Sequence, residues 1–309
     1  MKKMLILLTA LLLLLTSCTK EVTPDALELR EGVYFDKETN QPFSGRIVEK
    51  YGNGALKIEQ LLENGRFEGR QSQFYEDKSR KTVENYRSGT KDGAILGWYA
   101  NGQQQYDFYY LNGKEDGAFT EWFQDGSKKS EYGYKNGRRD GKCREWFENK
   151  QQLLEYIYND GLENGTFSRW YENGQLQSEV NYKDGRQEGD IMEYYPDGSK
   201  MKTAVYRQGL LEGTETSWYK NGQKQSEYNY QYGKKNGEGL EWYEDGTSKL
   251  EYNYADDKEN GLCIRWYENG KKAKEYNYLN GLRDGKCTDW AVDGKKISEL
   301  KYSADKVIY

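Results

Sequence analysis

Aromatic, apolar and polar positions recur along this chain with a period of 24 residues. If a recurring glycine is numbered position 0, position 6 is Tyr or Phe in ten of eleven repeats and position 17 is Tyr in ten. Position 8 is Asn or Asp in all eleven repeats, and position 9 is Gly in nine. The glycines at position 0 are Gly45, Gly69, Gly93, Gly117, Gly141, Gly165, Gly189, Gly213, Gly237, Gly261 and Gly285. The chain is therefore a repeat array without insertions.

Each repeat contains two turn signals, at positions 8 and 9 and around position 20, which predicts two strands per repeat. Asn-Gly and Asp-Gly favour the type I′ turn, because both of its central residues need a positive φ. We therefore expect tight two-residue hairpins. The predicted fold is all-β, an elongated single-layer twisted antiparallel meander of about eleven 24-residue β-hairpin repeats.

Side chains that face each other across a hairpin share one face of the sheet. A two-residue loop at positions 8 and 9 places position 0 opposite position 17, and position 2 opposite position 15. One face, the tyrosine face, then carries glycine, apolar residues and tyrosine. We expect it to be the packed, concave side. Its structural residues include Gly117, Gly141, Gly165, Tyr134, Tyr158 and Tyr182.

The opposite face, the tryptophan face, carries position 5 and is expected to be more exposed. Lys50, Phe74 and Tyr194 fill position 5 in three repeats. The other eight repeats hold all the tryptophans of the chain, which form the candidate binding surface: Trp98, Trp122, Trp146, Trp170, Trp218, Trp242, Trp266 and Trp290. For the aromatic residues of both faces, packing within a thin sheet is the alternative to binding.

The pattern G-x4-W-Y-x-N-G-x4-E-Y-x-Y-x2-G-x3-G resembles the MORN-repeat variant of bacterial YwqK-type proteins. The resemblance covers residues 45–309 and implies a long antiparallel meander. Residues 32–44 resemble the capping half-repeat that opens such arrays. Some proteins of this family are named antitoxins or immunity proteins, which implies a protein partner.

The N-terminus has the features of an export signal. Lys2 and Lys3 precede an apolar run from Met4 to Leu15, which is too short to span a bilayer. Residues 1–17 are expected to be the signal peptide. The sequence "LTSC" resembles a lipobox, which implies lipidation of Cys18. We expect residues 18–31 to form the lipidated N-terminus and tether, and the protein to be exported and lipid-anchored to the bacterial cell membrane or outer membrane. An ordinary signal peptide is the alternative.

Composition and charge exclude several kinds of site. Without Lys2 and Lys3, 44 basic residues face 51 acidic ones, a formal charge of −7, so no basic stripe is available for nucleic acid. The chain has no histidine, which excludes histidine-based catalytic triads and metal sites. Carboxylates recur in rows, and none breaks the repeat as a catalytic pair should. We therefore expect no enzymatic activity, no metal and no cofactor.

The cysteines distinguish a meander from a β-solenoid. Cys143, Cys263 and Cys287 all occupy position 2 of their repeats. In a meander, equivalent positions of adjacent repeats lie two strands, or about 9.6 Å, apart, which is too far for a disulfide. We predict that Cys263 and Cys287 are free thiols. A solenoid would bring them to about 4.8 Å and could bridge them.

Three classes of function remain on sequence grounds. The favoured one is a non-catalytic, membrane-anchored scaffold that binds another protein, in the manner of an antitoxin or immunity protein. The second is a binder of cell-wall or other glycans, because rows of exposed tryptophan suit sugar rings. The third, an enzyme, has no supporting residue. Replacing Trp122, Trp146 and Trp170 by alanine is expected to abolish binding, whereas the same change at Tyr134, Tyr158 and Tyr182 should unfold the array.

Overall fold

A computed structural model describes residues 20–308. The expected signal peptide at residues 1–17 and the expected lipidation site at Cys18 lie outside the described residues. The chain divides into an N-terminal unit, which extends to Gln104 and includes Tyr109–Lys114, and a C-terminal unit, which contains Gln105–Phe108 and the residues from Glu115 onward. Among the described residues, no helix has the length and apolar character needed to cross a membrane.

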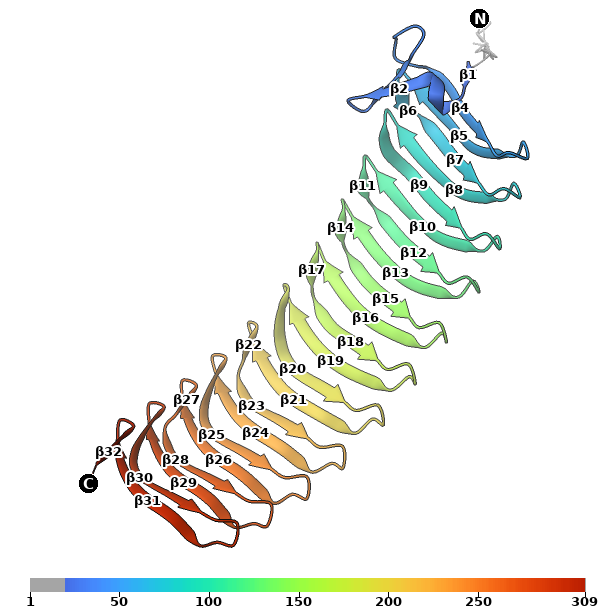
Figure 1. Cartoon of the computed structure of the whole chain (residues 1–309). Helices are drawn as coiled ribbons and strands as arrows, with labels where there is room; N and C mark the ends of the chain where they lie inside the picture. The colour runs from blue at the N-terminus through green and yellow to red at the C-terminus, as the bar shows by residue number, and fades with distance from the viewer. Residues whose placement is uncertain (1–19, 309) are drawn as a thin grey trace, which may run out of the picture. The chain divides into compact units, whose positions relative to one another are not determined.

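The N-terminal unit is built of β-hairpins preceded by a short cap (Figure 1). Strands β4, β5, β7, β8 and β9 pair antiparallel in sequence order. One pair departs from the expected antiparallel arrangement, because β1 runs parallel to β4. The elements are β1 (Glu21–Val22), the 3-10 helix η1 (Pro24–Ala26), β2 (Leu27–Arg30), β3 (Val33–Asp36), β4 (Gly45–Lys50), β5 (Leu56–Glu63), β6 (Arg66–Phe67), β7 (Gly69–Phe74), β8 (Arg80–Arg87) and β9 (Thr90–Trp98).

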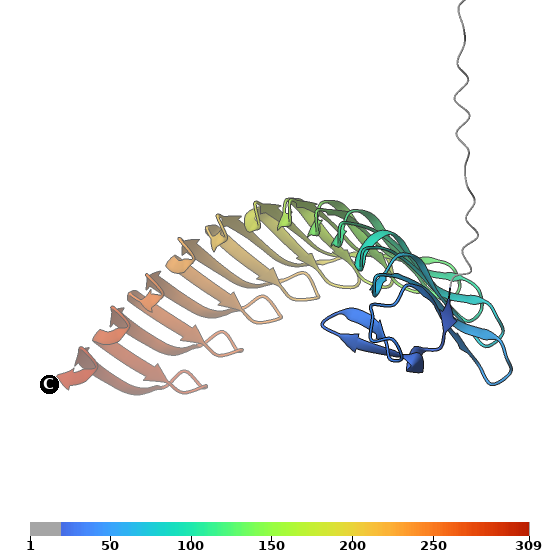
Figure 2. The ribbon, with the colours of Figure 1, turned by 90° about the horizontal axis from the view of Figure 1, so that it is seen from above.

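The cap closes the tyrosine face of the first repeat. Its hairpin β2–β3 begins at Leu27, within the segment expected to be a tether. Figure 2 shows this hairpin beside the first strands of the sheet. Leu27 and Phe43 pack against Ile47 of β4 and Leu62 of β5, and all four are at most 6% exposed. The sequence pattern places Ile47 and Leu62 at positions 2 and 17, so the cap supplies the layer that covers these apolar positions.

Asp36 ties the cap together through polar contacts. Its carboxylate lies 2.5 Å from Lys20 Nζ and accepts hydrogen bonds from the backbone amides of Glu38 and Thr39. The hydrogen bond from Lys20 and those from the two amides lower the pKa of Asp36 to about 2. The cap therefore loses this contribution to its stability as the pH falls from about 4 towards 2.

The C-terminal unit repeats the same hairpin along its length (Figure 1). Strands β10 (Gln104–Leu111) and β11 (Lys114–Glu115) contain the division between the two units. They are followed by β12 (Gly117–Trp122), β13 (Lys128–Lys135), β14 (Arg138–Arg139), β15 (Gly141–Trp146), β16 (Gln152–Asn159), β17 (Leu162–Glu163), β18 (Gly165–Trp170), β19 (Leu176–Lys183), β20 (Arg186–Tyr194), β21 (Lys200–Arg207), β22 (Leu210–Leu211), β23 (Gly213–Trp218), β24 (Lys224–Gln231), β25 (Lys234–Trp242), β26 (Ser248–Ala255), β27 (Lys258–Glu259), β28 (Gly261–Trp266), β29 (Lys272–Leu279), β30 (Leu282–Trp290), β31 (Lys296–Ser303) and β32 (Lys306–Ile308). The predicted all-β array of repeated hairpins is confirmed in both units.

The predicted register is confirmed, for example in the hairpin formed by β12 and β13. Gly117 lies opposite Tyr134, and Phe119 lies opposite Tyr132. The second turn of each repeat is of type I′, as predicted. Asn136 and Gly137, for example, have φ values of 51° and 82°.

The first turn differs from the expected two-residue type I′ turn. Gly126 N–H donates to Phe123 O, and Phe123 N–H donates to Ser127 O. Gly126 has a positive φ and Asp125 does not, so this is a type I turn closed by a left-handed glycine, with a three-residue loop. A bulge beside Trp122 adds one residue to the returning strand. The three-residue loop shifts the pairing of the two strands by one residue, and the bulge shifts it back by one. The predicted register therefore holds along the rest of the hairpin.

The glycine at position 0 forms a second bulge. Tyr182 pairs with Gln187 and Val180 pairs with Ile191. An advance of two residues along β19 therefore corresponds to four residues along β20. Gly189 lies inside this bulge with a φ of 90°. A Cβ at the equivalent Gly117 or Gly141 would meet no atom within 4 Å. Backbone conformation, and not lack of space, therefore requires glycine at these two positions.

Cys263 and Cys287 are buried, free thiols, as predicted, and Cys143 is also buried and free. Antiparallel pairing of β28, β29 and β30 confirms the meander and excludes the solenoid. Burial raises the pKa of Cys263 to about 11 and also raises the pKa of Cys143 and Cys287.

We expect Cys263 to react with iodoacetamide at pH 8 about 100-fold more slowly in the folded protein than in urea, because its thiolate is scarce in the fold. Peptide mass spectrometry after timed alkylation measures this ratio. Because the pKa is raised on folding, stability should also fall as the pH rises from about 8.5 towards 11. Equal alkylation rates in buffer and in urea would contradict the burial of this thiol.

Candidate functional site

Each of the eight tryptophans ends a strand, at the point where the chain enters the type I turn. All eight are half-buried, as are Tyr134, Tyr158 and Tyr182. Deeply buried side chains lie on both faces of the sheet: Cys143, at position 2 of the tyrosine face, is 0% exposed, and Thr288, at position 3 of the tryptophan face, is 1% exposed. Burial therefore does not distinguish the two faces, and it does not separate the tryptophans from the tyrosines at position 17.

Lysines from the preceding repeat lie over several of the tryptophan rings. Lys128 Nζ lies 6.0 Å from the centroid of the Trp146 ring, and Lys224 Nζ lies 5.7 Å from that of Trp242. Lys200 and Trp218 form the same pair at 6.0 Å. Each lysine occupies position 11. The tryptophan face therefore presents cations stacked on aromatic rings at regular intervals.

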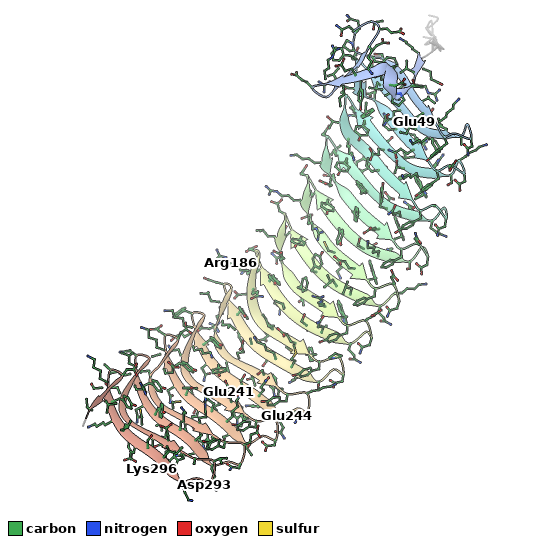
Figure 3. All side chains as sticks on the ribbon, viewed as in Figure 1. Glu49, Arg186, Glu241, Glu244, Asp293 and Lys296 are labelled. Atoms are coloured by element: carbon green, nitrogen blue, oxygen red, sulfur yellow. The ribbon has the colours of Figure 1, made fainter. Side chains whose placement is uncertain are left out.

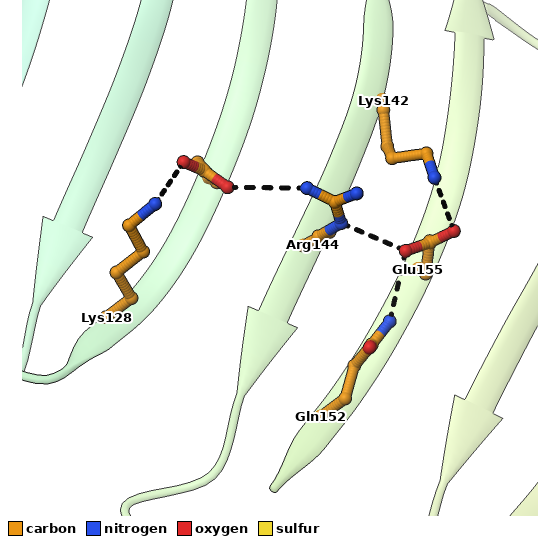
Figure 4. A network of polar contacts seen from close by, with 6 residues as sticks. Lys128, Lys142, Arg144, Gln152 and Glu155 are labelled. Atoms are coloured by element: carbon orange, nitrogen blue, oxygen red, sulfur yellow. Dashed lines mark hydrogen bonds and ion pairs between the residues drawn. The ribbon is translucent and has the colours of Figure 1, made fainter. Parts of the chain in front are cut away.

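Carboxylates and cations alternate across neighbouring strands of the tryptophan face (Figure 4). Glu131 lies 2.5 Å from Lys128 Nζ and 3.7 Å from the Arg144 guanidinium of the next repeat. Arg144 Nε also donates to Glu155 at 2.9 Å, and Lys142 lies 2.7 Å from the same carboxylate. Pairs of exposed charges add little to stability. Their effect here is to hold charged groups of both signs in fixed places on the tryptophan face.

Neighbouring repeats are joined by two rows of side-chain hydrogen bonds at the tryptophan ends of the hairpins. The position-6 tyrosine hydroxyl donates to the position-5 carbonyl of the next repeat, as from Tyr219 to Trp242 at 2.9 Å. The position-8 asparagine donates to the position-7 carbonyl of the next repeat, as from Asn221 to Glu244 at 2.7 Å. Glu244 is labelled on this edge in Figure 3. The tyrosine bonds are made by Tyr51, Tyr75, Tyr171, Tyr195, Tyr219, Tyr243 and Tyr267.

These two rows were not foreseen in the sequence, although a signal was present. Position 6 is Tyr in eight of its ten aromatic occurrences, which indicates a need for the hydroxyl. Asp and Asn at position 8 also differ in their surroundings. Asp125 accepts from the amide and the hydroxyl of Ser127, whereas Asn149 accepts only the amide of Gln151 and donates to the next repeat.

Phe123 and Phe147 interrupt the tyrosine row, since they lack the hydroxyl. We expect Phe123→Tyr and Phe147→Tyr to raise the free energy of unfolding by about 1 kcal/mol each, the usual net value of one hydrogen bond. Urea unfolding measures the gain. The reverse change, Tyr219→Phe, serves as the matched control and should cost a similar amount. A loss of stability in both gain variants would show that the carbonyls of Trp146 and Trp170 are out of reach.

The polar groups of the tyrosine face are largely bonded to one another. The Tyr132 hydroxyl donates to Glu145 at 2.6 Å, and the Tyr228 hydroxyl donates to Glu241, which Figure 3 labels. The Arg139 guanidinium lies 4.3 Å from the Tyr132 ring centroid and donates to the Tyr156 hydroxyl at 2.6 Å. Burial raises the pKa of Tyr156 to about 12, so this hydroxyl stays protonated. These contacts fit the expected packing role of this face.

The described residues contain no group of three or more cysteine or acidic side chains placed to hold a metal ion. Residues 163–184, 211–232 and 259–280 match the family described as MORN repeat variant. No curated protein matches the sequence.

The solved structures that this chain resembles include parts of much larger chains. The chain in the crystal structure of TcdB2-TccC3-Cdc42 has 11% identity and a TM-score of 0.19, with 88% of this chain and 17% of that chain covered. The chain in the Photorhabdus luminescens Tc holotoxin pore, with the mutation TccC3-D651A, has 12% identity and a TM-score of 0.17, with coverages of 84% and 15%. TM-scores this low do not indicate a shared fold.

Proposed function

Because the chain carries MORN repeat variants, we propose that it is a non-catalytic interaction protein whose tryptophan face binds another protein. In this proposal the protein is exported and held at a membrane by a lipid on Cys18. An antitoxin-like or immunity-like role is the specific form of this function that we favour. The proposal rests on the array described above and on the resemblance of the N-terminus to a lipoprotein signal.

The observation that carries the proposal is the recurrence of half-buried tryptophans at one position of eight repeats. Tryptophan is among the residues that contribute most to protein interfaces, and its partly exposed ring offers a large rigid surface. The flanking ion pairs hold both signs of charge in place, which favours specificity for a complementary protein surface. On the tyrosine face, in contrast, hydroxyls and carboxylates form hydrogen bonds with each other.

A glycan partner is the second candidate, because rows of tryptophan suit sugar rings. Stacking of a sugar needs an open ring face. Lys128, Lys200 and Lys224 lie over the rings of Trp146, Trp218 and Trp242. This arrangement favours the protein partner over the glycan.

The test is capture of membrane proteins by the mature chain, with a triple variant that keeps the fold. Phe74 occupies position 5 naturally, so Trp122→Phe, Trp146→Phe and Trp170→Phe should be tolerated. We expect one protein to be recovered in stoichiometric amount and to be lost with this variant.

The matched control replaces Tyr134, Tyr158 and Tyr182 by phenylalanine on the tyrosine face, and it should retain the partner. Equal loss in both variants would contradict the assignment of binding to the tryptophan face. Sedimentation with purified cell wall, without recovery of a protein, would instead establish the glycan function.

A further inference from the structure

A hollow of about 420 Å³ lies on the tryptophan face of the N-terminal unit. Its floor is formed by Leu61, Ser72 and Phe74, which come from β5 and β7. Ser72 is 5% exposed. The register places Glu59 opposite Ser72 and Arg80 opposite Phe74, so the lining belongs to one face of adjacent strands. This volume is within the range of sites that hold small molecules.

The aromatic residue in the hollow is smaller than its equivalents. Phe74 occupies position 5, which is tryptophan in eight of the eleven repeats. A phenyl ring fills less space than an indole, so this repeat leaves more room at position 5 than a repeat with tryptophan there. Phe74 is half-buried and presents an apolar surface to the hollow.

Three arginines and one glutamate line the hollow, a net charge of +2 in a chain with a net charge of −5. Arg46 is paired with Glu59. Arg70 and Arg80 are exposed, and among the residues that the structure describes neither forms an ion pair or a side-chain hydrogen bond. Two free guanidinium groups therefore border the same hollow.

The absence of a partner for Arg70 and Arg80 follows from one replacement within the repeat. In other repeats a glutamate at position 14 pairs with the cation at position 1 or 11, as in Lys142–Glu155 at 2.7 Å and Lys128–Glu131 at 2.5 Å. In the repeat of Arg70 and Arg80, position 14 is Val83, which is 4% exposed. This repeat thus has cations at both positions and lacks the acid that neutralises them elsewhere.

We propose that this hollow binds a small molecule that carries a doubly charged oxyanion on a flat apolar body. The anion takes the place of the missing glutamate and is held by the guanidinium groups of Arg70 and Arg80, because the arginine fork matches carboxylate and phosphate oxygens. The Phe74 ring receives the apolar body. A phosphate monoester and a dicarboxylate share this chemistry.

The test is calorimetric titration of the full chain with two probes, phenyl phosphate and phthalate. We expect saturable binding of at least one probe at a single site, weakened at least tenfold by Arg70→Gln or by Arg80→Gln. Preference for phenyl phosphate would identify a phosphate ester as the ligand class, and preference for phthalate would identify a dicarboxylate. Inorganic phosphate should bind more weakly than phenyl phosphate, because it has no group to contact Phe74.

Val83→Glu provides a second and independent variant. It restores the glutamate of the other repeats and should abolish binding with both arginines intact. Lys142→Gln, at position 1 of another repeat, is the matched control and should leave binding unchanged. Thermal unfolding checks that each variant is folded. Absence of saturable binding of both probes, or binding that survives all three variants at the hollow, would overturn the proposal. None of these outcomes depends on the capture of a protein partner.

Discussion

Replacing Leu62 by alanine is expected to lower the free energy of unfolding of the N-terminal unit by about 2–5 kcal/mol, the usual cost of removing a buried leucine side chain. Leu62 is 2% exposed and packs with Leu27, Phe43 and Ile47. Leu27 and Phe43 come from the cap, so the cavity would loosen the cap from the first repeat. Urea unfolding followed by tyrosine fluorescence measures the change.

Leu29→Ala is the matched control for this prediction. Leu29 lies in β2 of the same cap but is 57% exposed. Its replacement should change the free energy of unfolding by less than about 0.5 kcal/mol, as is usual for surface substitutions. If Leu62→Ala were no more costly than Leu29→Ala, the cap would not contribute to the apolar core of this unit.

Gly133→Ala is expected to destabilise the C-terminal unit by about 3 kcal/mol, near the upper end of the usual cost of overpacking. A Cβ at Gly133 would lie 2.1 Å from the carbonyl oxygen of Asp140. That oxygen belongs to the backbone beside the bulge, where Asp140 N–H donates to Gly133 O at 2.9 Å. The backbone at Gly133 and the backbone at Asp140 would have to move away from each other. Thermal and urea unfolding of the full chain measure the loss.

Gly141→Ala, in the same junction, is the control that separates the cost of steric crowding from the cost of an unfavourable backbone conformation. Its Cβ would meet nothing within 4 Å, but its φ is 89°. The cost should therefore be only about 1–2 kcal/mol, which is the cost of a left-handed conformation for an alanine. A larger loss for Gly141→Ala than for Gly133→Ala would contradict the close approach of Asp140 to β13.

The period and the register were predictable because they depend on side-chain pattern alone. Glycine and apolar residues on one strand match tyrosines on the next, as in the pairs Gly117–Tyr134 and Phe119–Tyr132. This match determines which residues face each other, regardless of the turn type. The first turn was not predictable in the same way. Asp125-Gly126 suits a type I′ turn in isolation, but the side chain of Asp125 instead binds the amide of Ser127 and leaves only Gly126 with a positive φ. A dipeptide signal does not reveal that competition.

The site was predicted less completely than the fold. The position of each tryptophan on one face follows from the register, but the contact of Trp146 with Lys128 of the preceding repeat does not follow from the pattern of one repeat. The hollow beside Phe74 depends on two departures from the repeat, at Phe74 and at Val83. Phe74 keeps an aromatic ring at position 5, whereas Val83 removes an acid at position 14. Only the strand register shows that they leave Arg70 and Arg80 at the same place.

The bonds between repeats all span fixed distances along the chain. The tyrosine and asparagine bonds join residues 23 apart, and the acids before the bulges bind the turn amides 20 residues later, as Asp140 does with Asp160. Removing or adding one segment of 24 residues would therefore leave every donor opposite an equivalent acceptor. An array of such similar segments, with "WYENG" written twice, can therefore gain or lose a repeat and keep the contacts between neighbouring repeats. The array is thus free to vary in reach while its internal chemistry stays the same.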